Sequence, residues 1–588
     1  MTDRPAQPDA RAAVPRPRAA DHSADRRMLV LAAMALVTGT GGALAAWLLL
    51  HLIELTVNLF WYQRISVEPA SIVDAATGPI VLLVPVIGSL IVGLMARFGS
   101  DKIRGHGIPE AIEAILYGES KLSPRVAFLK PLSSAISIGS GGPFGAEGPI
   151  IMTGGAVGSL FAQRFRLTAA ERKTLLVAGA AAGMTAIFGT PVAAILLAIE
   201  VLLFEWKPRS FVPVIVSATV AFAWRPLLIG SGPLFPFDAA LPIDGTVLLL
   251  SAVLGCLAGG VAGLLSTLLY RIEDVFHRLP VHWMWWPALG AVIVGVGGLI
   301  EPRVLGAGYG SIQDLLDGRL MLAAMVLLFA AKAVVWLIAL GSGTSGGVLA
   351  PLLILGGALG GVAGYWLPGG SGPWAMLGMA GVMSAAMRAP LTSAIFVVEL
   401  TGHFAELPAA VAASGAAYAI AVLALRRSIL TEKISRRGRH VSQEFSVDPL
   451  ALGMAADLMT RDPETLPETM SIADATHFFE TEAVHQTYPV VDADHRPVGL
   501  AARRDALHWQ RLDDRQTVSL GDRLSDRSLP VATPDTPADA IANLMITNEV
   551  GRICVVAPDD GRLIGIISRR DLLQSRAAVL RGERDRAR

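Results

Sequence analysis

Charged residues, aromatic residues and cysteines are scarce in this sequence of 588 residues. Asp, Glu, Lys and Arg together make up 17% of the chain and aromatic residues 6%, and there are two cysteines, Cys256 and Cys554. Two such cysteines support neither a disulfide framework nor a metal cluster. The formal net charge is zero and the basic residues form no stripe, so the sequence gives no sign of a nucleic-acid-binding surface.

Apolar residues dominate instead, at 53% of the chain. A chain this long and this apolar is not one soluble domain, so most of it is predicted to lie in a membrane. The apolar runs between residues 28 and 425 are uneven, and several are shorter than the ~20 residues that a membrane span needs. Short helices that end inside a bilayer are tolerated where their ends face protein or a water-filled cavity. This pattern predicts an ion site near the midplane.

The two ends of the apolar region carry basic residues. Residues 1–27 are rich in Ala, Pro and Arg without periodicity, which predicts a disordered arm, and a secretory signal would place its apolar core nearer Met1. The basic residues at the two ends are Arg4, Arg11, Arg16, Arg18, Arg26 and Arg27, then Arg426, Arg427, Lys433, Arg436, Arg437 and Arg439. Because cytoplasmic flanks are enriched in Lys and Arg, both termini are expected in the cytoplasm.

Residues 139–149, GSGGPFGAEGP, place a lone carboxylate, Glu147, in glycine-rich backbone before an apolar helical run. Glycines let several N–H groups turn toward one point, and a helix N-terminus adds the positive end of its dipole. Such a site attracts an anion, and Glu147 is itself an anion. We therefore expect Glu147 to compete with a dissolved anion and to act as a gate.

The same pattern returns as GSGTSGGVLAP at residues 341–351, an offset of 341 − 139 = 202, where Glu147 meets Leu349. Residues 183–200 likewise match residues 382–399 at an offset of 199. The membrane region is therefore predicted to be duplicated. Glycine- and proline-broken segments at corresponding places of two halves point to a midplane binding site in transport proteins.

The chain turns polar near residue 444. Residues 487–507 are echoed by residues 552–573, with Gly499 meeting Gly565 and Asp505 meeting Asp571 at an offset of 66. Each copy is predicted to fold as strand, tight turn, strand and helix. Two small α/β modules therefore follow the membrane region.

With GHGIPEA at residues 105–111, GAEGP at 145–149, GGVLAP at 346–351 and the two modules, the chain resembles the CLC chloride channels and proton/chloride exchangers that carry tandem CBS domains. The resemblance implies an all-α multi-pass membrane domain of two inverted repeats with broken helices, joined to an α/β pair of cytoplasmic CBS domains. It also implies a homodimer with one anion path per subunit. The boundaries it implies are an arm at 1–27, repeats at 28–241 and 242–430, a linker at 431–450, CBS domains at 451–515 and 516–576, and a tail at 577–588.

By this resemblance Glu147 is the gating glutamate, and neighbouring backbone groups line the path of chloride or a similar small anion. The residues expected at the anion are His106, Gly107, Ile108, Pro109, Gly145, Ala146, Gly148, Val348, Leu349 and Leu430.

Four positions depart from the family pattern. Leu430 stands where an anion-contacting Tyr is expected, Leu349 replaces the usual Phe, and Ala146 replaces an Arg. His106 replaces the usual Ser, so that either its ring supplies an N–H donor or the ring points away and the backbone alone acts. We therefore expect the backbone rather than side chains to coordinate the anion.

The position of a proton-relaying glutamate in coupled exchangers is Val201 here, and a valine cannot relay a proton. This favours a passive channel. The alternative is an exchanger that takes protons through another group, such as His106 or Glu205. Glu200, next to Val201, and its partner Glu399 in the repeat are expected to be buried, hydrogen-bonded carboxylates.

Two lysines lie in apolar runs. Lys130, between the two anion-binding motifs, would raise the local potential for chloride, whereas Lys332 is expected to extend toward a membrane interface. In the second CBS module, Ser568 and Asp571 match residues that bind an adenine nucleotide in this family, but the first has Ala502 beside Asp505. The modules therefore either bind one nucleotide or serve only as a dimer platform. No cofactor is expected in the membrane domain.

Two other classes of protein carry CBS domains. A CBS-regulated cation transporter needs several acidic residues along its path, and the apolar runs offer too few. An intramembrane metalloprotease needs HExxH, which this sequence lacks, so no enzyme activity is predicted. We expect a multi-pass protein of the plasma membrane, in a prokaryote the inner membrane.

Overall fold

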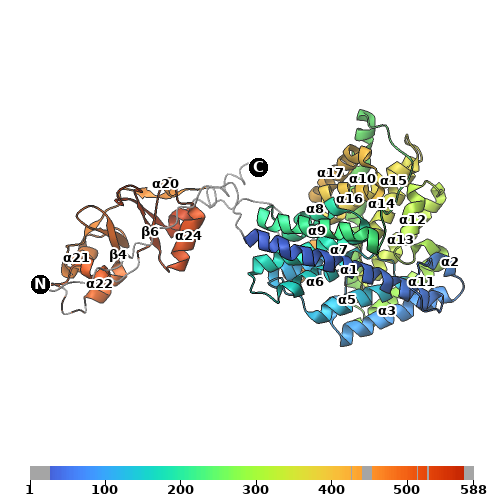
Figure 1. Ribbon diagram of the computed structural model, residues 1–588, viewed down its shortest axis with the longest axis horizontal. Coiled ribbons are helices and arrows are strands. Elements are labelled where there is room, and N and C mark those ends of the chain that lie inside the picture. Colours follow the sequence, from blue (N-terminus) through green and yellow to red (C-terminus); the bar gives the residue numbers. More distant parts are fainter. Residues whose placement is uncertain are drawn as a thin grey trace. The chain divides into compact units, whose positions relative to one another are not determined.

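The computed structural model describes residues 27–425, 427–439, 453–510, 512, 514, 516–525 and 529–574. The chain divides into two compact units, and the described residues fall into a helical unit up to residue 439 and a mixed unit from residue 453 (Figure 1). The predicted arm is described only at Arg27, and residues 440–450 of the predicted linker and the tail at 577–588 lie outside the described residues.

The helical unit contains two consecutive series of helices. The first is α1 Arg27–Trp61, α2 Ile72–Ala75, α3 Ile80–Phe98, η1 Asp101–Ile103, α4 Ile108–Tyr117, α5 Pro124–Gly139, α6 Glu147–Ala162, α7 Ala169–Phe188, α8 Pro191–Leu197, the π-helix η2 Ala198–Leu203 and α9 Pro208–Leu228. The second is α10 Gly245–His277, η3 Trp283–Trp285, α11 Trp286–Ile300, η4 Pro302–Val304, α12 Tyr309–Leu316, α13 Leu322–Gly341, α14 Leu349–Gly364, α15 Ser371–Met387, α16 Pro390–Thr401, η5 Phe404–Glu406, α17 Leu407–Ala424 and α18 Ile429–Arg436. The predicted boundary between residues 430 and 431 thus falls inside α18.

Seven helices in the described part of the chain are long and apolar enough to cross a membrane. They are Arg27–Trp61, Ile80–Phe98, Pro208–Leu228, Gly245–His277, Trp283–Ile300, Leu322–Gly341 and Phe404–Arg436. Between them lie shorter apolar helices, among them α14 and α16. This mixture of spanning and short helices confirms the predicted multi-pass domain with broken helices.

The two series repeat the same elements. α6 and α14 are both 16 residues long and begin at Glu147 and Leu349, which are 202 residues apart. The pair η1 and α4 corresponds to η4 and α12 at an offset of 309 − 108 = 201. α1 lies along α5, α6, α7 and α9, and α10 lies along α13, α15 and α17 (Figure 1). The predicted duplication is confirmed, and it extends to α12, which the sequence comparison did not include.

Glycines let the helices approach closely in two helical hairpins, α6–α7 in the first series and α14–α15 in the second. A Cβ atom added at Gly154 of α6 would lie 2.3 Å from the carbonyl oxygen of Gly179 of α7. In the second series, a Cβ atom at Gly356 of α14 would lie 2.4 Å from the carbonyl oxygen of Gly378 of α15. Small residues at such contacts allow backbones to pack where burial from lipid supplies little driving force. The same packing device therefore holds both hairpins.

Capping residues and prolines set the helix ends. The Thr168 hydroxyl accepts a hydrogen bond from the Glu171 N–H at the start of α7. α7 ends at Gly189, whose φ of 70° is left-handed, and α15 ends at Arg388 with a φ of 57°. Prolines then begin α8 and α16, where the missing N–H costs nothing. These capping residues and prolines end one helix and start the next, which produces the short helices that the apolar pattern predicts.

The mixed unit contains α20 Ala455–Leu458, β1 Thr460–Arg461, β2 Leu466–Pro467, α21 Ile472–Thr481, β3 Thr487–Val491, β4 Pro497–Ala502, α22 Arg503–Trp509, α23 Leu520–Leu524, β5 Val531–Ala532, α24 Ala538–Thr547, β6 Arg552–Val556 and β7 Leu563–Ser568. Two sheets have the strand orders β2-β3-β4 and β1-β7-β6-β5. The antiparallel pairs β3–β4 and β6–β7 share a register irregularity at Val490/Val491 and Val555/Val556. The predicted pair of α/β modules is confirmed.

The modules exchange short segments, so the predicted boundary between residues 515 and 516 divides them differently from the structure. β1 pairs with β7 of the second module, and Ala455 belongs to the second module's core. Conversely, Leu520 and Leu524 of α23 pack in the core of the first module. Sequence similarity between the copies starts too late to reveal this exchange.

Candidate functional site

Three glycine-rich turns meet in the helical unit, immediately before α4, α6 and α14. The Gly105 N–H donates to the Thr344 carbonyl at 3.1 Å, and the Gly347 N–H donates to the Gly145 carbonyl at 2.9 Å. The Gly145 N–H also donates to the Gly347 carbonyl at 3.4 Å. These bonds tie together the N-termini of three helices from both halves, so their positive dipole ends lie close to one another.

The turns approach so closely that side chains are excluded. A Cβ atom at Gly148 would lie 1.8 Å from the His106 carbonyl oxygen. Gly107 has a φ of 91°, and a Cβ atom there would lie 2.7 Å from the Gly148 carbonyl oxygen. Glycine is therefore required at both positions. Gly148 is required because a side chain has no space there, and Gly107 is required for the same reason and for its left-handed backbone conformation.

The carboxylate of Glu147 occupies the point where the turns meet. The side chain is fully buried, and neither oxygen has a hydrogen-bond partner of normal geometry among the described residues. The backbone N–H groups of Glu147 and Ala350, in the first turns of α6 and α14, lie beside the carboxylate. Cβ atoms at Gly145 and Gly347 would lie 2.0 and 2.6 Å from its Oε2. A single acidic group thus fills a cradle that favours an anion.

Two buried lysines, one in each half of the helical unit, bind carbonyls of glycine turns. The Lys130 ammonium on α5 donates to the carbonyls of Ile103 and Gly105, at 2.8 and 2.7 Å, and to the Ser345 hydroxyl at 3.0 Å. Lys130 therefore joins the first and third turns, whereas its place in the sequence is between the first and second anion-binding motifs.

Lys332 on α13 makes the equivalent contacts in the second half. Its ammonium donates to the carbonyls of Val304 and Gly306, at 2.8 and 3.2 Å, and the side chain is fully buried. The prediction that Lys332 extends to a membrane interface is wrong. Two inward carbonyls, released by the turn between η4 and α12, hold the ammonium inside.

Comparison with known proteins agrees with this architecture. The family model described as voltage gated chloride channel matches residues 87–422, and the CBS domain model matches residues 455–511 and 521–578. The chain belongs to the CLC family.

Relatives in this family cover the membrane region. The voltage-gated ClC-type chloride channel ClcB of Salmonella dublin is 33% identical over 400 residues, which are 65% of this chain and 93% of the relative. ClcB of Escherichia coli O81 is 33% identical over 355 residues, which are 58% of this chain and 84% of the relative.

Solved CLC structures show the same fold. A slow cyanobacterial Cl⁻/H⁺ antiporter matches with a TM-score of 0.61 and 23% identity, covering 71% of this chain and 99% of that one. A eukaryotic CLC transporter matches with a TM-score of 0.58 and 21% identity, covering 93% and 98%. A fluoride/proton antiporter of the CLC type gives 0.59 and 21%, covering 68% and 97%. CLC proteins carry anions across membranes and are not enzymes, and this chain is a CLC anion transporter of the membrane.

The other residues expected at the anion lie in or beside the same three helix starts. All are buried: Gly107, Ile108 and Pro109 at α4, Gly145, Ala146 and Gly148 at α6, and Val348 and Leu349 at α14. His106 is 2% exposed, and its ring nitrogen Nδ1 has no hydrogen-bond partner in the part of the chain that the structure describes. Its carbonyl packs on Gly148, so the backbone of His106 is built into the site.

Leu430 is buried in the first turn of α18, a helix that contacts α4. The contact with the turn before α4 is made three residues later, by Lys433. Its ammonium lies 3.1 Å from Glu110 Oε1 and would lie 1.9 Å from a Cβ atom at Gly105. The structure thus joins α18 to the first glycine turn through an ion pair rather than through an aromatic hydroxyl.

The second half also contributes a side chain that the sequence reasoning missed, Tyr309, the first residue of α12. Its hydroxyl is enclosed and has no hydrogen-bond partner among the described residues. The signal was the spacing of Gly306 and Gly308, which repeats that of Gly105 and Gly107 without sharing their neighbours.

Val201 and its neighbouring glutamate lie in the π-helix η2, and Val201 is fully buried. The Glu200 carboxylate accepts hydrogen bonds from the backbone N–H groups of Leu391 and Thr392, at 3.3 and 2.9 Å. Glu399 accepts from Val192 and Ala193, at 3.1 and 2.8 Å. Each carboxylate caps a helix in the other half.

In the CBS pair, Ser568 and Asp571 lie at the end of β7 and the start of the following helix. The Ser568 hydroxyl and N–H both donate to Asp571 Oδ2, at 2.7 and 2.8 Å. In the first module the Ala502 N–H donates to Asp505 Oδ2 at 3.1 Å, with no hydroxyl beside it. The two predicted nucleotide ligands are therefore side by side, and only the second module has both.

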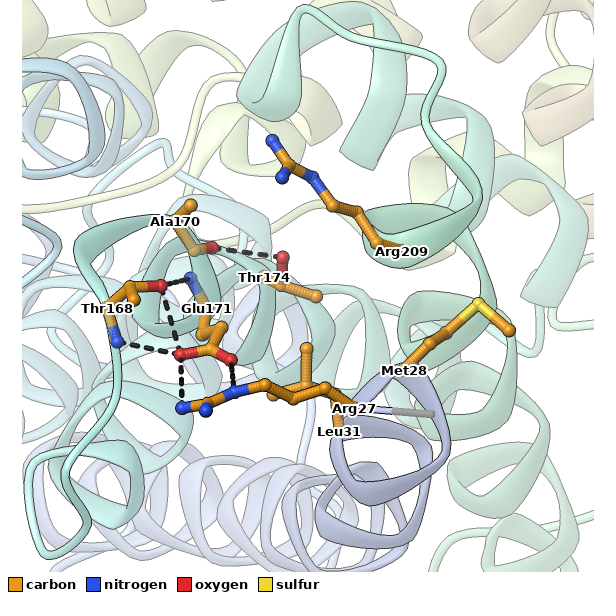
Figure 2. Close-up of a pocket in the computed structure, with 8 residues that line it drawn as sticks. All are labelled: Arg27, Met28, Leu31, Thr168, Ala170, Glu171, Thr174 and Arg209. Carbon is orange, nitrogen blue, oxygen red and sulfur yellow. Dashed lines mark hydrogen bonds and ion pairs between the residues drawn. The ribbon is translucent and has the colours of Figure 1, made fainter. Parts of the chain in front are cut away.

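A separate cavity of about 250 Å³ lies between α1, α7 and α9 (Figure 2). The Arg27 guanidinium pairs with Glu171, whose carboxylate also accepts from Thr168 at the start of α7. The Arg209 guanidinium points away from this pair (Figure 2). The cavity is at the opposite end of the α6–α7 hairpin from Glu147, about 24 Å away by helix rise. It is not part of the anion site.

Proposed function

We propose that this CLC protein is a passive anion channel for chloride, gated by Glu147. The observation that carries the proposal is the carboxylate of Glu147, buried where the N-termini of α6 and α14 meet. The same donors would bind a chloride ion if the carboxylate left. Protonation by acid would remove the competing charge and open the path.

Backbone donors carry the coordination in this proposal. A chloride ion loses water when it enters, and one helix dipole contributes at most ~2 kcal/mol, so donors from several helices must converge. The turns before α4, α6 and α14 supply N–H groups from three helices, and Lys130 adds a positive charge beneath them. The non-polar Ala146 and Leu349 leave this coordination to the backbone.

The passive mode is supported by Val201, which is buried and cannot carry a proton. The ClcB relatives are named chloride channels, which agrees with this mode. We further infer a homodimer in the bacterial inner membrane with both termini in the cytoplasm, from the family resemblance and from the basic residues that flank the apolar region.

The deciding experiment uses the full chain in liposomes that hold a chloride gradient, with valinomycin setting the voltage and a pH dye outside. A passive channel gives chloride efflux without proton uptake, and its reversal potential follows chloride alone. Proton movement uphill in a fixed ratio to chloride would show an exchanger instead. His106, buried beside the anion site, would then be the first group to replace.

The gate itself is tested by Glu147→Gln in the same liposomes. The amide has the shape of the carboxylate without its charge, so this variant should pass chloride at neutral pH and lose most of its response to acid. Glu119→Gln is a matched control, because Glu119 is an exposed carboxylate that pairs with Lys121 outside the anion site. A Glu147→Gln protein that stays closed and still opens in acid would contradict the gate.

A further inference from the structure

The internal duplication places a second helix start in correspondence with α4. Gly105 and Gly107 have φ values of 84° and 91°, and Gly306 and Gly308 have 64° and 71°. Lys130 and Lys332 bind the carbonyls of these two turns in the same way. The turn that positions the N-terminus of α4 at the anion path is therefore built again before α12. There the helix begins with Tyr309 instead of Ile108.

Tyr309 brings a hydroxyl to this place. The ring packs edge-on against Phe235, with 5.7 Å between ring centroids, and this contact fixes its direction. The polar groups near the hydroxyl include the carboxylate of Glu147 and the backbone N–H of Ala146, although neither forms a hydrogen bond of normal geometry with it. The Ala146 N–H can only donate, so the hydroxyl proton is left for an acceptor.

A buried hydroxyl without a partner is costly, and one that persists in a functional region indicates a ligand that comes and goes. The Tyr309 hydroxyl meets this description within the described residues. An anion at the Glu147 position is the acceptor that the surroundings offer.

We propose that the Tyr309 hydroxyl is a side-chain ligand of the anion path. It donates a hydrogen bond to the chloride ion that takes the place of the Glu147 carboxylate, whereas in the closed path it lies near that carboxylate without a hydrogen bond. This assignment rests on the proposed function and adds to it a hydroxyl from the second half. The hydroxyls that the family pattern leads one to expect are absent, because His106 replaces a Ser and Leu430 replaces a Tyr.

The electrostatic surroundings of Glu147 leave this role to Tyr309. The titratable side chains of the elements packed around the site include His106 before α4, Glu110 on α4, Lys130 on α5, Tyr309 on α12, Lys332 on α13 and Lys433 on α18. The Lys130 and Lys332 ammonium groups are bound to carbonyls, and Glu110 and Lys433 pair with each other. Tyr309 is the one whose hydroxyl is subject to the charge of Glu147.

Tyr309→Phe tests the proposal by removing one oxygen atom. In a Glu147→Gln background, calorimetric titration with chloride should show binding weakened roughly tenfold, as expected when a hydrogen bond to a charged group is lost. In the chain with Glu147 intact, the pH of half-maximal chloride flux should rise by roughly one unit. The charged carboxylate loses the nearby hydroxyl dipole, so it is protonated more readily.

Tyr365→Phe is the matched control, because Tyr365 is 63% exposed. Thermal melting without chloride separates a ligand from a structural role. Tyr309→Phe should melt like the parent, since the hydroxyl has no partner to lose, and should gain less stability from added chloride. Unchanged chloride affinity and unchanged pH response would overturn the proposal, as would a loss of stability confined to chloride-free protein. If the parent chain itself moves no chloride, the proposed function fails and not this assignment alone.

Discussion

At the scale of single residues, the position of the Glu147 carboxylate depends on two glycines, which have no Cβ atom. Gly145 and Gly347 leave room for the carboxylate, which lies within 2.6 Å of where each Cβ atom would be. The carboxylate is the end of a flexible side chain, so it can move when crowded, whereas the backbone around it cannot. Because these two glycines leave space for the carboxylate, it can occupy the anion site and keep the path closed.

Gly145→Ala should open the path without changing any charge. The added methyl group would lie 2.0 Å from Glu147 Oε2, and overpacking of this kind costs ~1–3 kcal/mol. Chloride efflux from liposomes at neutral pH should rise about tenfold, the population change that ~1.4 kcal/mol produces. Gly260→Ala is the control, because a Cβ atom there has no neighbour within 4 Å. Equal efflux from both variants would show that Glu147 does not close the path.

Residues also mark the limit of what the sequence could predict. The glycine turns, Glu147 and Lys130 were found because rare residue types stood in broken apolar runs. Lys332 was misplaced, because a lysine in an apolar run looks the same whether it reaches lipid headgroups or buried carbonyls. Its partners, Val304 and Gly306, become acceptors only once the chain has turned.

At the scale of helices, the main device is the exchange of caps between the halves. The Glu200 side chain projects from η2 and caps α16, while the Glu399 side chain projects from α16 and caps α8. A carboxylate at a helix N-terminus satisfies free N–H groups and interacts favourably with the dipole. The sequence predicted buried, hydrogen-bonded carboxylates at these positions, and the hydrogen bonds agree, although both side chains keep partial exposure.

Replacing either cap should weaken the fold and spare transport. Glu399→Ala and Glu200→Ala each leave two backbone N–H groups without their acceptors, at a cost of ~1–2 kcal/mol. Thermal melting of both variants in detergent should therefore drop by similar amounts, and chloride flux per folded protein should stay near that of the parent. A variant with normal melting and lost flux would give that glutamate a direct transport role.

Helices show why the duplication was only partly visible beforehand. α6 and α14 share glycines and a proline at equal spacing, so their match could be read directly. α4 and α12 share only Gly-x-Gly and a backbone conformation, and GHGIPEA and GAGYGSI differ at every other position. Backbone shape persisted where side chains changed, which is why Tyr309 was overlooked.

At the scale of the whole chain, the CBS pair offers a comparison within one molecule. Asp505 and Asp571 cap equivalent helices, but only Asp571 has a hydroxyl beside it, from Ser568. We propose that the second module binds one adenine nucleotide per chain through this pair. The alternative, a dimer platform without a ligand, makes the opposite prediction.

Titration of the full chain with ATP, ADP and AMP in a calorimeter should give one site per chain. Asp571→Ala should weaken binding at least roughly tenfold, through the loss of a charge-assisted hydrogen bond. Asp505→Ala removes an equivalent cap in the first module and should leave binding unchanged. Absence of heat with all three nucleotides in the parent chain would favour the platform.

The single cysteine of each unit allows the mixed unit to be followed alone. Burial raises the pKa of the Cys554 thiol to about 12, so almost no reactive thiolate is present near pH 8. In a Cys256→Ser chain, maleimide should therefore label Cys554 only after the CBS pair unfolds in denaturant. Rapid labelling of the native protein would contradict the burial of this residue.

The exchanged caps also set an order of events during synthesis. Glu200 is synthesised 192 residues before Thr392, whose backbone N–H donates a hydrogen bond to the Glu200 carboxylate. At ~5–20 residues per second, the carboxylate waits about 10–40 s in an unfinished chain. For that interval the first half has an unpaired acid beside apolar helices, so the insertion machinery, water or a proton must accompany it. A nascent chain arrested before residue 390 should therefore be retained by that machinery, while one that extends well beyond Thr401, the end of α16, can be released to fold.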